Sequence, residues 1–132
     1  MGAIDLLKAQ LLVFPHLPCD AHGATVSVPA ATETGFSVTL QETRHGALVI
    51  FGGGWHEEFR HADEAVSCFL FGLSARCRLR VVTRGRLRCR WTVEVWEEGE
   101  WRPESTVGLL LVPFWRGAEV SYLQNDWFAG EG

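Results

Sequence analysis

Residues 55–61, which follow three consecutive glycines, carry side chains suited to acid–base chemistry. They read Trp-His-Glu-Glu-Phe-Arg-His. A zinc protease helix needs two histidines four residues apart with a glutamate directly after the first, whereas His56 and His61 are five apart. This spacing favours an exposed strand or loop, with Trp55 and Phe59 packed inward, over a metal site. The alternative is a small acid–base site or ligand pocket, which would be lined by Trp55, His56, Glu58 and His61.

A second cluster of potential ligands lies in the loop after the first helical segment. It consists of His16, Cys19, Asp20 and His22. These residue types bind zinc, but a structural zinc site usually takes paired ligands from two elements, and the sequence offers no second pair. A Cys19 nucleophile with a neighbouring histidine as base is also unfavourable, because close sequence neighbours rarely reach that geometry. We therefore expect no metal, no cofactor and no catalytic residue here.

The third cluster is basic and falls in one predicted hairpin. Seven of the twelve lysines and arginines lie there without an intervening acid: Arg76, Arg78, Arg80, Arg84, Arg86, Arg88 and Arg90. One face of this hairpin could bind anions or stack on single-stranded nucleic acid, through Arg78, Arg80, Arg88, Arg90 and Trp96. We favour a solvated face that is neutralised by the glutamates between residues 94 and 104, because exposed charge runs are weak evidence of function.

The register of this hairpin follows from burial, because the apolar residues of both strands must share one face. A three-residue loop, Arg84–Arg86, meets that condition and pairs Thr83 with Leu87. On the charged face this register predicts three opposed pairs: Arg80 with Arg90, Arg78 with Thr92, and Arg76 with Glu94. The following turn at Glu98 is expected to bring Trp101 beside Trp96.

Hydrophobic periodicity predicts the elements that position these clusters. Helices are expected over residues 3–14 and 62–74, and strands over 25–28, 36–41, 48–51, 76–83, 87–97, 107–115 and 118–124, of which 107–115 should be buried. This order predicts one α+β domain over residues 1–132. It would consist of a single curved, antiparallel sheet of about six to seven strands on the central helix, with the N-terminal helix beside it.

The central helix is apolar on nearly every side, which is typical of a helix that is buried from several directions. One sheet covers one face, so the N-terminal helix or a second subunit must cover the rest. The tail residues Tyr122, Trp127 and Phe128 present the same two alternatives: they fold back as a cover or pack against a partner.

Composition limits the class of protein. Apolar residues make up 47% and charged residues 21%, as in ordinary globular domains, and the net charge of −4 opposes a general affinity for nucleic acid. No apolar run approaches the ~20 residues that span a bilayer, so we expect no membrane segment. The four cysteines include no Cys-x-x-Cys pair, which indicates free thiols and a cytoplasmic location.

These observations favour a non-catalytic domain that acts by binding a protein partner or a second copy of itself, as a homodimer. The first alternative is a small-molecule-binding protein or small enzyme with a pocket between the central helix and the sheet. The second is anion or single-stranded nucleic-acid binding by the arginine-rich face. An enzyme is less favoured than a binding domain, because the sequence has no phosphate loop, no correctly spaced metal ligands and no recognisable nucleophile motif.

Overall fold

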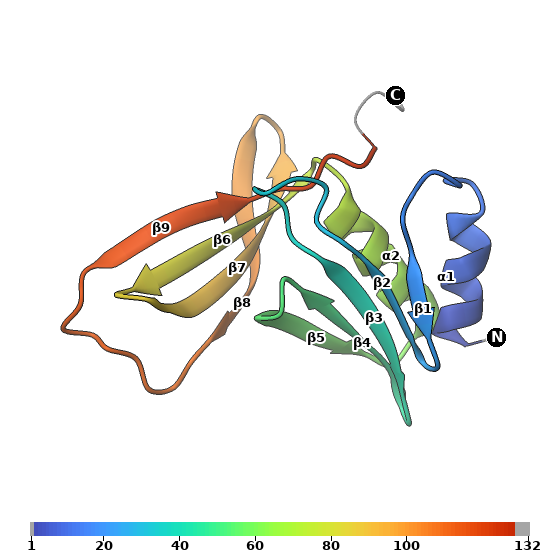
Figure 1. The fold of residues 1–132 in the computed structure, drawn as a ribbon, viewed down its shortest axis with the longest axis horizontal. Coiled ribbons are helices and arrows are strands. Elements are labelled where there is room, and N and C mark those ends of the chain that lie inside the picture. Colours follow the sequence, from blue (N-terminus) through green and yellow to red (C-terminus); the bar gives the residue numbers. More distant parts are fainter. Residues whose placement is uncertain (1, 129–132) are drawn as a thin grey trace.

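The computed structural model describes residues 2–128 and contains two helices and nine strands in that range (Figure 1). In chain order they are α1 (Ala3–Leu11), β1 (Asp20–His22), β2 (Thr25–Val28), β3 (Val38–Thr43), β4 (Gly46–Phe51), β5 (Trp55–Phe59), α2 (Ala62–Leu73), β6 (Cys77–Arg84), β7 (Leu87–Glu97), β8 (Glu100–Gly108) and β9 (Ala118–Leu123). Within the described residues, neither helix is long and apolar enough to cross a membrane.

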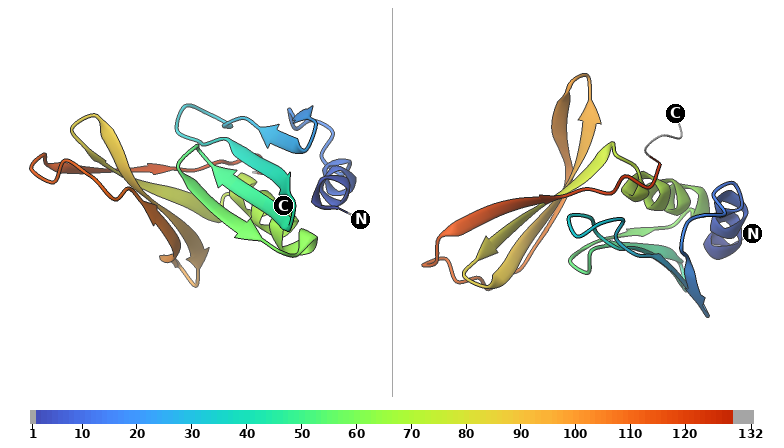
Figure 2. Two further views of the ribbon diagram at one scale, coloured as in Figure 1. Left: turned by 90° about the horizontal axis from the view of Figure 1, so that it is seen from below. Right: turned by 45° about the horizontal axis from the view of Figure 1, so that its top comes forward.

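Strands β1 to β5 form a five-stranded antiparallel meander, sheet A, in sequence order. Apolar residues alternate along these strands, so they gather on one face. Val38 and Leu40 of β3, and Val49 and Phe51 of β4, are all fully buried on that face. The helices lie against it, with α2 in contact with β3, β4 and β5 (Figure 2).

Helix α2 is enclosed from several sides, as its sequence predicts. Ala65, Phe69 and Leu73 are fully buried, because sheet A covers one side of the helix, α1 a second and β6 a third. Gly72 lets the Phe51 ring pack directly on the helix, since a Cβ there would come within 2.5 Å of that ring. Helix α1 therefore supplies additional cover for α2, which is one of the two alternatives that the sequence left open.

The remaining four strands form a second antiparallel sheet, sheet B, in the order β8-β7-β6-β9. One end of sheet B packs against sheet A, where the Trp91 indole lies on Gly54 and Trp55 Nε1 donates to Ser105 Oγ at 3.3 Å. The other end projects away from both helices (Figures 1 and 2).

The prediction of an antiparallel α+β fold is confirmed, but the prediction of one continuous sheet is wrong. Helix α2 separates β5 from β6 along the chain, and β6 pairs with β7 and β9 instead of extending sheet A. Strands that follow one another along the chain usually pair when the connection between them is short. β5 and β6 are joined through α2, so their order along the chain does not predict that they pair. The central helix is thus covered by sheet A and by β6 of sheet B.

The prediction of a buried strand over residues 107–115 is also wrong. β8 ends at Gly108, and residues 109–117 form a connection outside both sheets. β8 and β9 stand at opposite edges of sheet B, so the chain between them must pass around the end of the β6–β7 hairpin. An apolar run alone does not reveal this topological requirement.

Of the three tail residues, Trp127 and Phe128 fold back onto the segments that follow β2 and α1, whereas Tyr122 belongs to β9 of sheet B. Trp127 Nε1 donates to the Pro29 carbonyl at 3.2 Å, and the Phe128 ring lies 4.5 Å from that of Phe14. Between this tail and β9, Asn125 is fully buried. Its amide donates to the carbonyls of Phe36 and Gly72, and its oxygen accepts from the Ala31 and Phe36 amides. One side chain thereby joins the end of sheet B to sheet A and α2.

Candidate functional site

The four residues proposed to line one ligand pocket lie on different surfaces. On β5, Trp55 is buried beneath sheet A, whereas His56 and Glu58 are exposed on its outer face, because alternate residues of a strand point to opposite sides. His61 lies at the N-terminal end of α2 and lines a separate depression near α1. The inward packing of Trp55 and Phe59 is as expected from the sequence.

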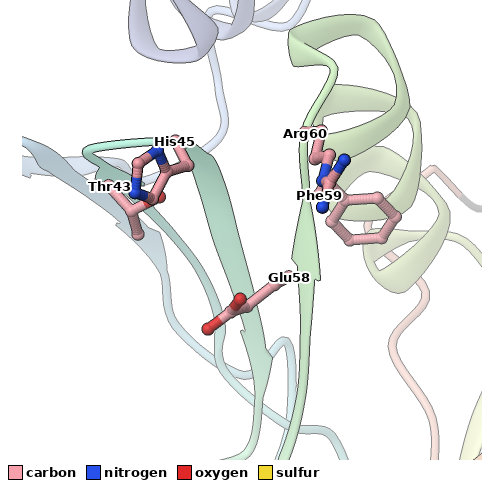
Figure 3. Close-up of a pocket in the computed structure, with 5 residues that line it drawn as sticks. All are labelled: Thr43, His45, Glu58, Phe59 and Arg60. Carbon is pink, nitrogen blue, oxygen red and sulfur yellow. The ribbon is translucent and has the colours of Figure 1, made fainter.

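Glu58 instead contributes to a polar depression beside the β3–β4 turn, shown in Figure 3. Its other lining residues are Thr43, His45, Phe59 and Arg60, and its volume is about 570 Å³. Figure 3 shows Phe59 turned toward α2, away from Glu58. No hydrogen bond or ion pair among the described residues joins His45, Glu58 and Arg60.

The arginine-rich hairpin has a register two residues away from the predicted one. A two-residue turn pairs Arg84 with Leu87, and a bulge between Val82 and Thr83 restores the apolar face. The opposed residues on the charged face are Arg78 with Glu94, Arg80 with Thr92, and Val82 with Arg90. The predicted Arg80–Arg90, Arg78–Thr92 and Arg76–Glu94 pairs are therefore wrong. A two-residue loop also places the apolar residues of both strands on one face when a bulge adds one residue to a strand. The alternation of apolar and charged residues in the sequence does not reveal such a bulge.

Arg78 is held within the protein by its neighbours on this face. Its Nε lies 2.5 Å from Glu94 Oε1, and its guanidinium carbon lies 4.5 Å from the Trp101 ring centre and 4.0 Å from that of Tyr122. Trp96 contacts Trp101 edge-on at 5.4 Å, as the predicted turn requires. An arginine that is paired with a carboxylate and stacked on two rings stabilises the sheet. It is not available to an external anion.

The other arginines of the face are unpaired toward the end of sheet B that projects from the molecule. Within residues 2–128, no carboxylate lies within ion-pair distance of Arg80, Arg88 or Arg90. The glutamates that were expected to neutralise them lie elsewhere: Glu94 pairs with Arg78, Glu104 lines a separate cleft, and Arg102 contacts Glu97, Glu98 and Glu100. Neutralisation of the face is thus limited to Arg78, and the distal end of the sheet is basic.

At that distal end, the β8–β9 connection exposes a cluster of large apolar side chains, which we call the apolar tip. Its members, with their exposed fractions, are Leu109 (44%), Leu110 (98%), Leu111 (90%), Phe114 (77%) and Trp115 (71%). Large contiguous apolar patches are uncommon on monomeric proteins and mark interaction surfaces. These residues are visible in the sequence as an apolar run. The prediction of a buried strand there did not identify them as an exposed surface.

Arginines border the apolar tip. Arg84, Arg86 and Arg116 line a depression there together with Trp115. Arg84 Nη1 donates to the Arg116 carbonyl at 2.9 Å, which ties the connection to the end of the β6–β7 hairpin. Basic side chains therefore lie directly beside the exposed Trp115 of the apolar tip.

A second surface lies between α2 and β5 on one side and β7 and β8 on the other, and we call it the acidic cleft. It has a volume of about 390 Å³ and is lined by Trp55, Glu57, Phe59, Ser67, Cys68, Phe71, Val93, Val95, Glu104 and Ser105. The lining combines three aromatic rings with two carboxylates and contains no basic residue. This cleft lies between the central helix and a sheet, where the sequence suggested a ligand pocket. Its lining includes Glu57 and not the predicted Glu58.

Three of the four cysteines, Cys19, Cys68 and Cys77, lack the lowered pKa of an activated nucleophile. Burial, followed by the charge of Glu57, raises the pKa of Cys68 to about 12, and burial also raises the pKa of Cys77 and of Cys19. A catalytic thiol needs a lowered pKa. All four cysteines are free. In the loop cluster, His22 Nε2 lies 2.9 Å from Asp20, and no group of three potential metal ligands occurs among residues 2–128.

Comparisons with protein-family models, with curated proteins and with solved structures yield no significant match.

Proposed function

We propose that this chain is a non-catalytic binding domain that docks onto another polypeptide through the apolar tip. The exposure of Leu110, Leu111, Phe114 and Trp115 on one connection is the observation that supports the proposal. Exposed aliphatic side chains favour a protein surface over nucleic acid, because leucine offers neither a π face for base stacking nor a charge for phosphate. The bordering arginines extend the same surface and favour a partner with acidic groups.

The proposal is tested by placing a photo-crosslinking phenylalanine analogue at position 110 and, as a control, at position 12. Leu12 is matched because it is also a leucine outside regular structure and 80% exposed, but it lies at the end of α1. Irradiation in cells should give an adduct with one polypeptide from position 110 and none from position 12. Trp115→Ser should remove the adduct and weaken binding of the purified partner at least ~10-fold, as for an aromatic anchor.

Equal labelling at both positions, an adduct with nucleic acid, or no adduct would contradict the proposal. Thermal unfolding of Trp115→Ser and Leu110→Ser provides the necessary check on folding. Both side chains are largely exposed, so neither substitution should change the unfolding free energy by more than ~0.5 kcal/mol.

The acidic cleft supports a second candidate function, the binding of an organic cation. The partly exposed Phe59 and Phe71 supply aromatic surface beside the buried Trp55, and Glu57 and Glu104 supply negative charge. Aromatic rings combined with carboxylates are the groups that recognise alkylammonium ligands. The negative potential of the two carboxylates favours a cationic ligand over an anionic one.

Choline and its uncharged carbon analogue 3,3-dimethylbutan-1-ol are suitable probes of this second candidate. The Trp55 indole proton, which is hydrogen-bonded to Ser105, should show a saturable shift in NMR spectra with choline and a weaker response to the analogue. Glu57→Gln should reduce the affinity for choline, whereas Glu58→Gln, on the opposite face of β5, should not. Equal binding of both probes, or an equal effect of both substitutions, would contradict cation recognition.

A further inference from the structure

The two sheets have four edge strands, and three of them carry features that prevent strand addition. β1 has only three residues, two of them Asp20 and His22. β5 presents a His-Glu-Glu sequence, and β8 contains Pro103 between charged neighbours. Short length, charge and proline are the usual means by which proteins protect sheet edges. These three strands therefore resist pairing with another chain.

β9 lacks this protection. It is six residues long, contains no proline, and has Glu119 as its one charged residue. Residues 118–122 are all exposed, so no other segment of residues 2–128 covers the strand. Val120 and Tyr122 are 45% and 47% exposed. An open edge with apolar side chains is a template for strand addition.

We infer that β9 pairs with β9 of a second copy of this chain, in antiparallel orientation, to form a homodimer with a continuous eight-stranded sheet. The inference rests on the proposed function and names its partner. Antiparallel pairing of two identical strands is self-complementary, which a two-fold symmetric dimer requires. No second sequence has to be matched, and the unprotected edge strand is saturated by a single partner.

The charges on the two copies are complementary in this arrangement. The apolar tip and its arginines precede β9, while the other end of β9 lies beside residues 33–34, because the Gln124 amide donates to the Thr34 carbonyl at 2.8 Å. Antiparallel pairing brings the tip of each copy to that other end, where Glu33 and Asp126 are exposed. The two arginine clusters are then separated by the length of the strand, roughly 20 Å.

The apolar tip is also needed to give the interface sufficient area. A stable interface buries ~800 Å² per partner, which is more than the pairing of one six-residue strand provides. Aromatic residues bury ~150–250 Å² each, so Phe114 and Trp115 together can contribute a large part of the remainder. The proposed interface therefore includes both the β9 edge and the apolar tip.

Light scattering coupled to size-exclusion chromatography tests the inference on the full chain. The wild-type chain should elute as a dimer with twice the 14.7 kDa chain mass and dissociate on dilution. Val120→Lys adds a charge to the open edge and should give a monomer. His56→Lys adds a comparable charge to an exposed position on the protected edge β5, and should remain dimeric. Hydrogen exchange at the β9 amides that point away from β6 should be slow in the wild type and His56→Lys, and fast in Val120→Lys.

The other outcomes separate the two proposals. A dimer that survives Val120→Lys but dissociates with Trp115→Ser would overturn strand pairing and retain docking through the apolar tip. A wild-type monomer at every concentration would overturn the homodimer, and the crosslink from position 110 would then decide whether a different protein occupies the tip. A dimer that is insensitive to both substitutions would overturn β9 and the apolar tip as the dimer interface, and the crosslink from position 110 would again decide whether a different protein occupies the tip.

Discussion

At the scale of single residues, the direction of a side chain decides its role more than its chemical type. Glu57 and Glu58 are adjacent and identical, yet one lines the acidic cleft and the other lies on the outer face of sheet A. Burial of Trp55 and Phe59 could have been used to select Glu57, because residues two apart on a strand share a face. The burial of Asn125 could not be predicted in this way, because nothing in the sequence distinguishes a buried asparagine side chain from one in an exposed turn.

Asn125 is the residue whose replacement should destabilise the fold most clearly. Asn125→Leu would leave the carbonyls of Phe36 and Gly72 and the amides of Ala31 and Phe36 without partners in the interior. Unsatisfied buried groups cost ~1–3 kcal/mol each when they cannot reach water. We expect a loss of at least ~3 kcal/mol in urea unfolding. Gln124→Ala, which removes one exposed hydrogen bond, should cost less than ~1 kcal/mol.

The raised pKa of Cys68 predicts how the unfolding free energy depends on pH in the alkaline range. Its pKa is raised from 9.0 to about 12 in the folded protein, mainly by burial. The neutral thiol is therefore favoured by folding, and its contribution is fully present below pH 9 and lost as pH rises toward 12. The unfolding free energy should fall over that range, by up to ~1.4 kcal/mol per pH unit. Cys68→Ala should make the decline shallower in pH-dependent urea titrations. An unchanged slope would exclude Cys68 as the cause.

At the scale of elements, periodicity located most helices and strands correctly but could not decide what each one packs against. The central helix and the strands of the arginine-rich hairpin lie within a residue or two of their predicted bounds. Their partners were harder to predict, because a bulge changed the hairpin register and the α2 connection separated the sheets. The apolar run after β8 is the clearest example. A buried strand and an exposed apolar connection have the same run of apolar residues in the sequence, so the sequence alone does not distinguish them.

The contact between the two sheets can be tested at Gly54. A Cβ at this position would overlap the Trp91 indole, so Gly54→Ala must displace either the ring or the β4–β5 turn. Overpacking of this kind costs typically ~1–3 kcal/mol, and the melting temperature should fall accordingly. Gly117→Ala is the matched control because a Cβ there meets nothing within 4 Å, and it should leave the melting temperature unchanged. Equal effects of the two substitutions would show that Trp91 does not press on Gly54.

At the scale of the whole molecule, stability and recognition lie at opposite ends. The apolar core joins sheet A, both helices and the near end of sheet B. The distal end of sheet B contributes little to that core, yet it carries the apolar tip, the unpaired arginines and the open edge of β9. A net charge of −4 for the chain conceals this division, because the basic end is offset by acidic residues elsewhere. Average composition therefore predicted the globular class and gave no indication of where the binding surface lies.

This division predicts a gradient of local stability along sheet B in the monomeric Val120→Lys variant. Amides near α2, such as those of Leu79 and Val93, belong to strands whose side chains are buried in the core. They should exchange only through global unfolding. Residues 84–88 at the hairpin end are partly or fully exposed, so their hydrogen bonds can open locally at a lower free energy.

Native-state hydrogen exchange at increasing urea concentration measures this gradient. Protection at Leu79 and Val93 should follow the global unfolding free energy, whereas protection at Arg88 should not depend on urea. Uniform protection along the sheet would mean that the distal end is part of the cooperative core, and the separation of stability from recognition would then be wrong.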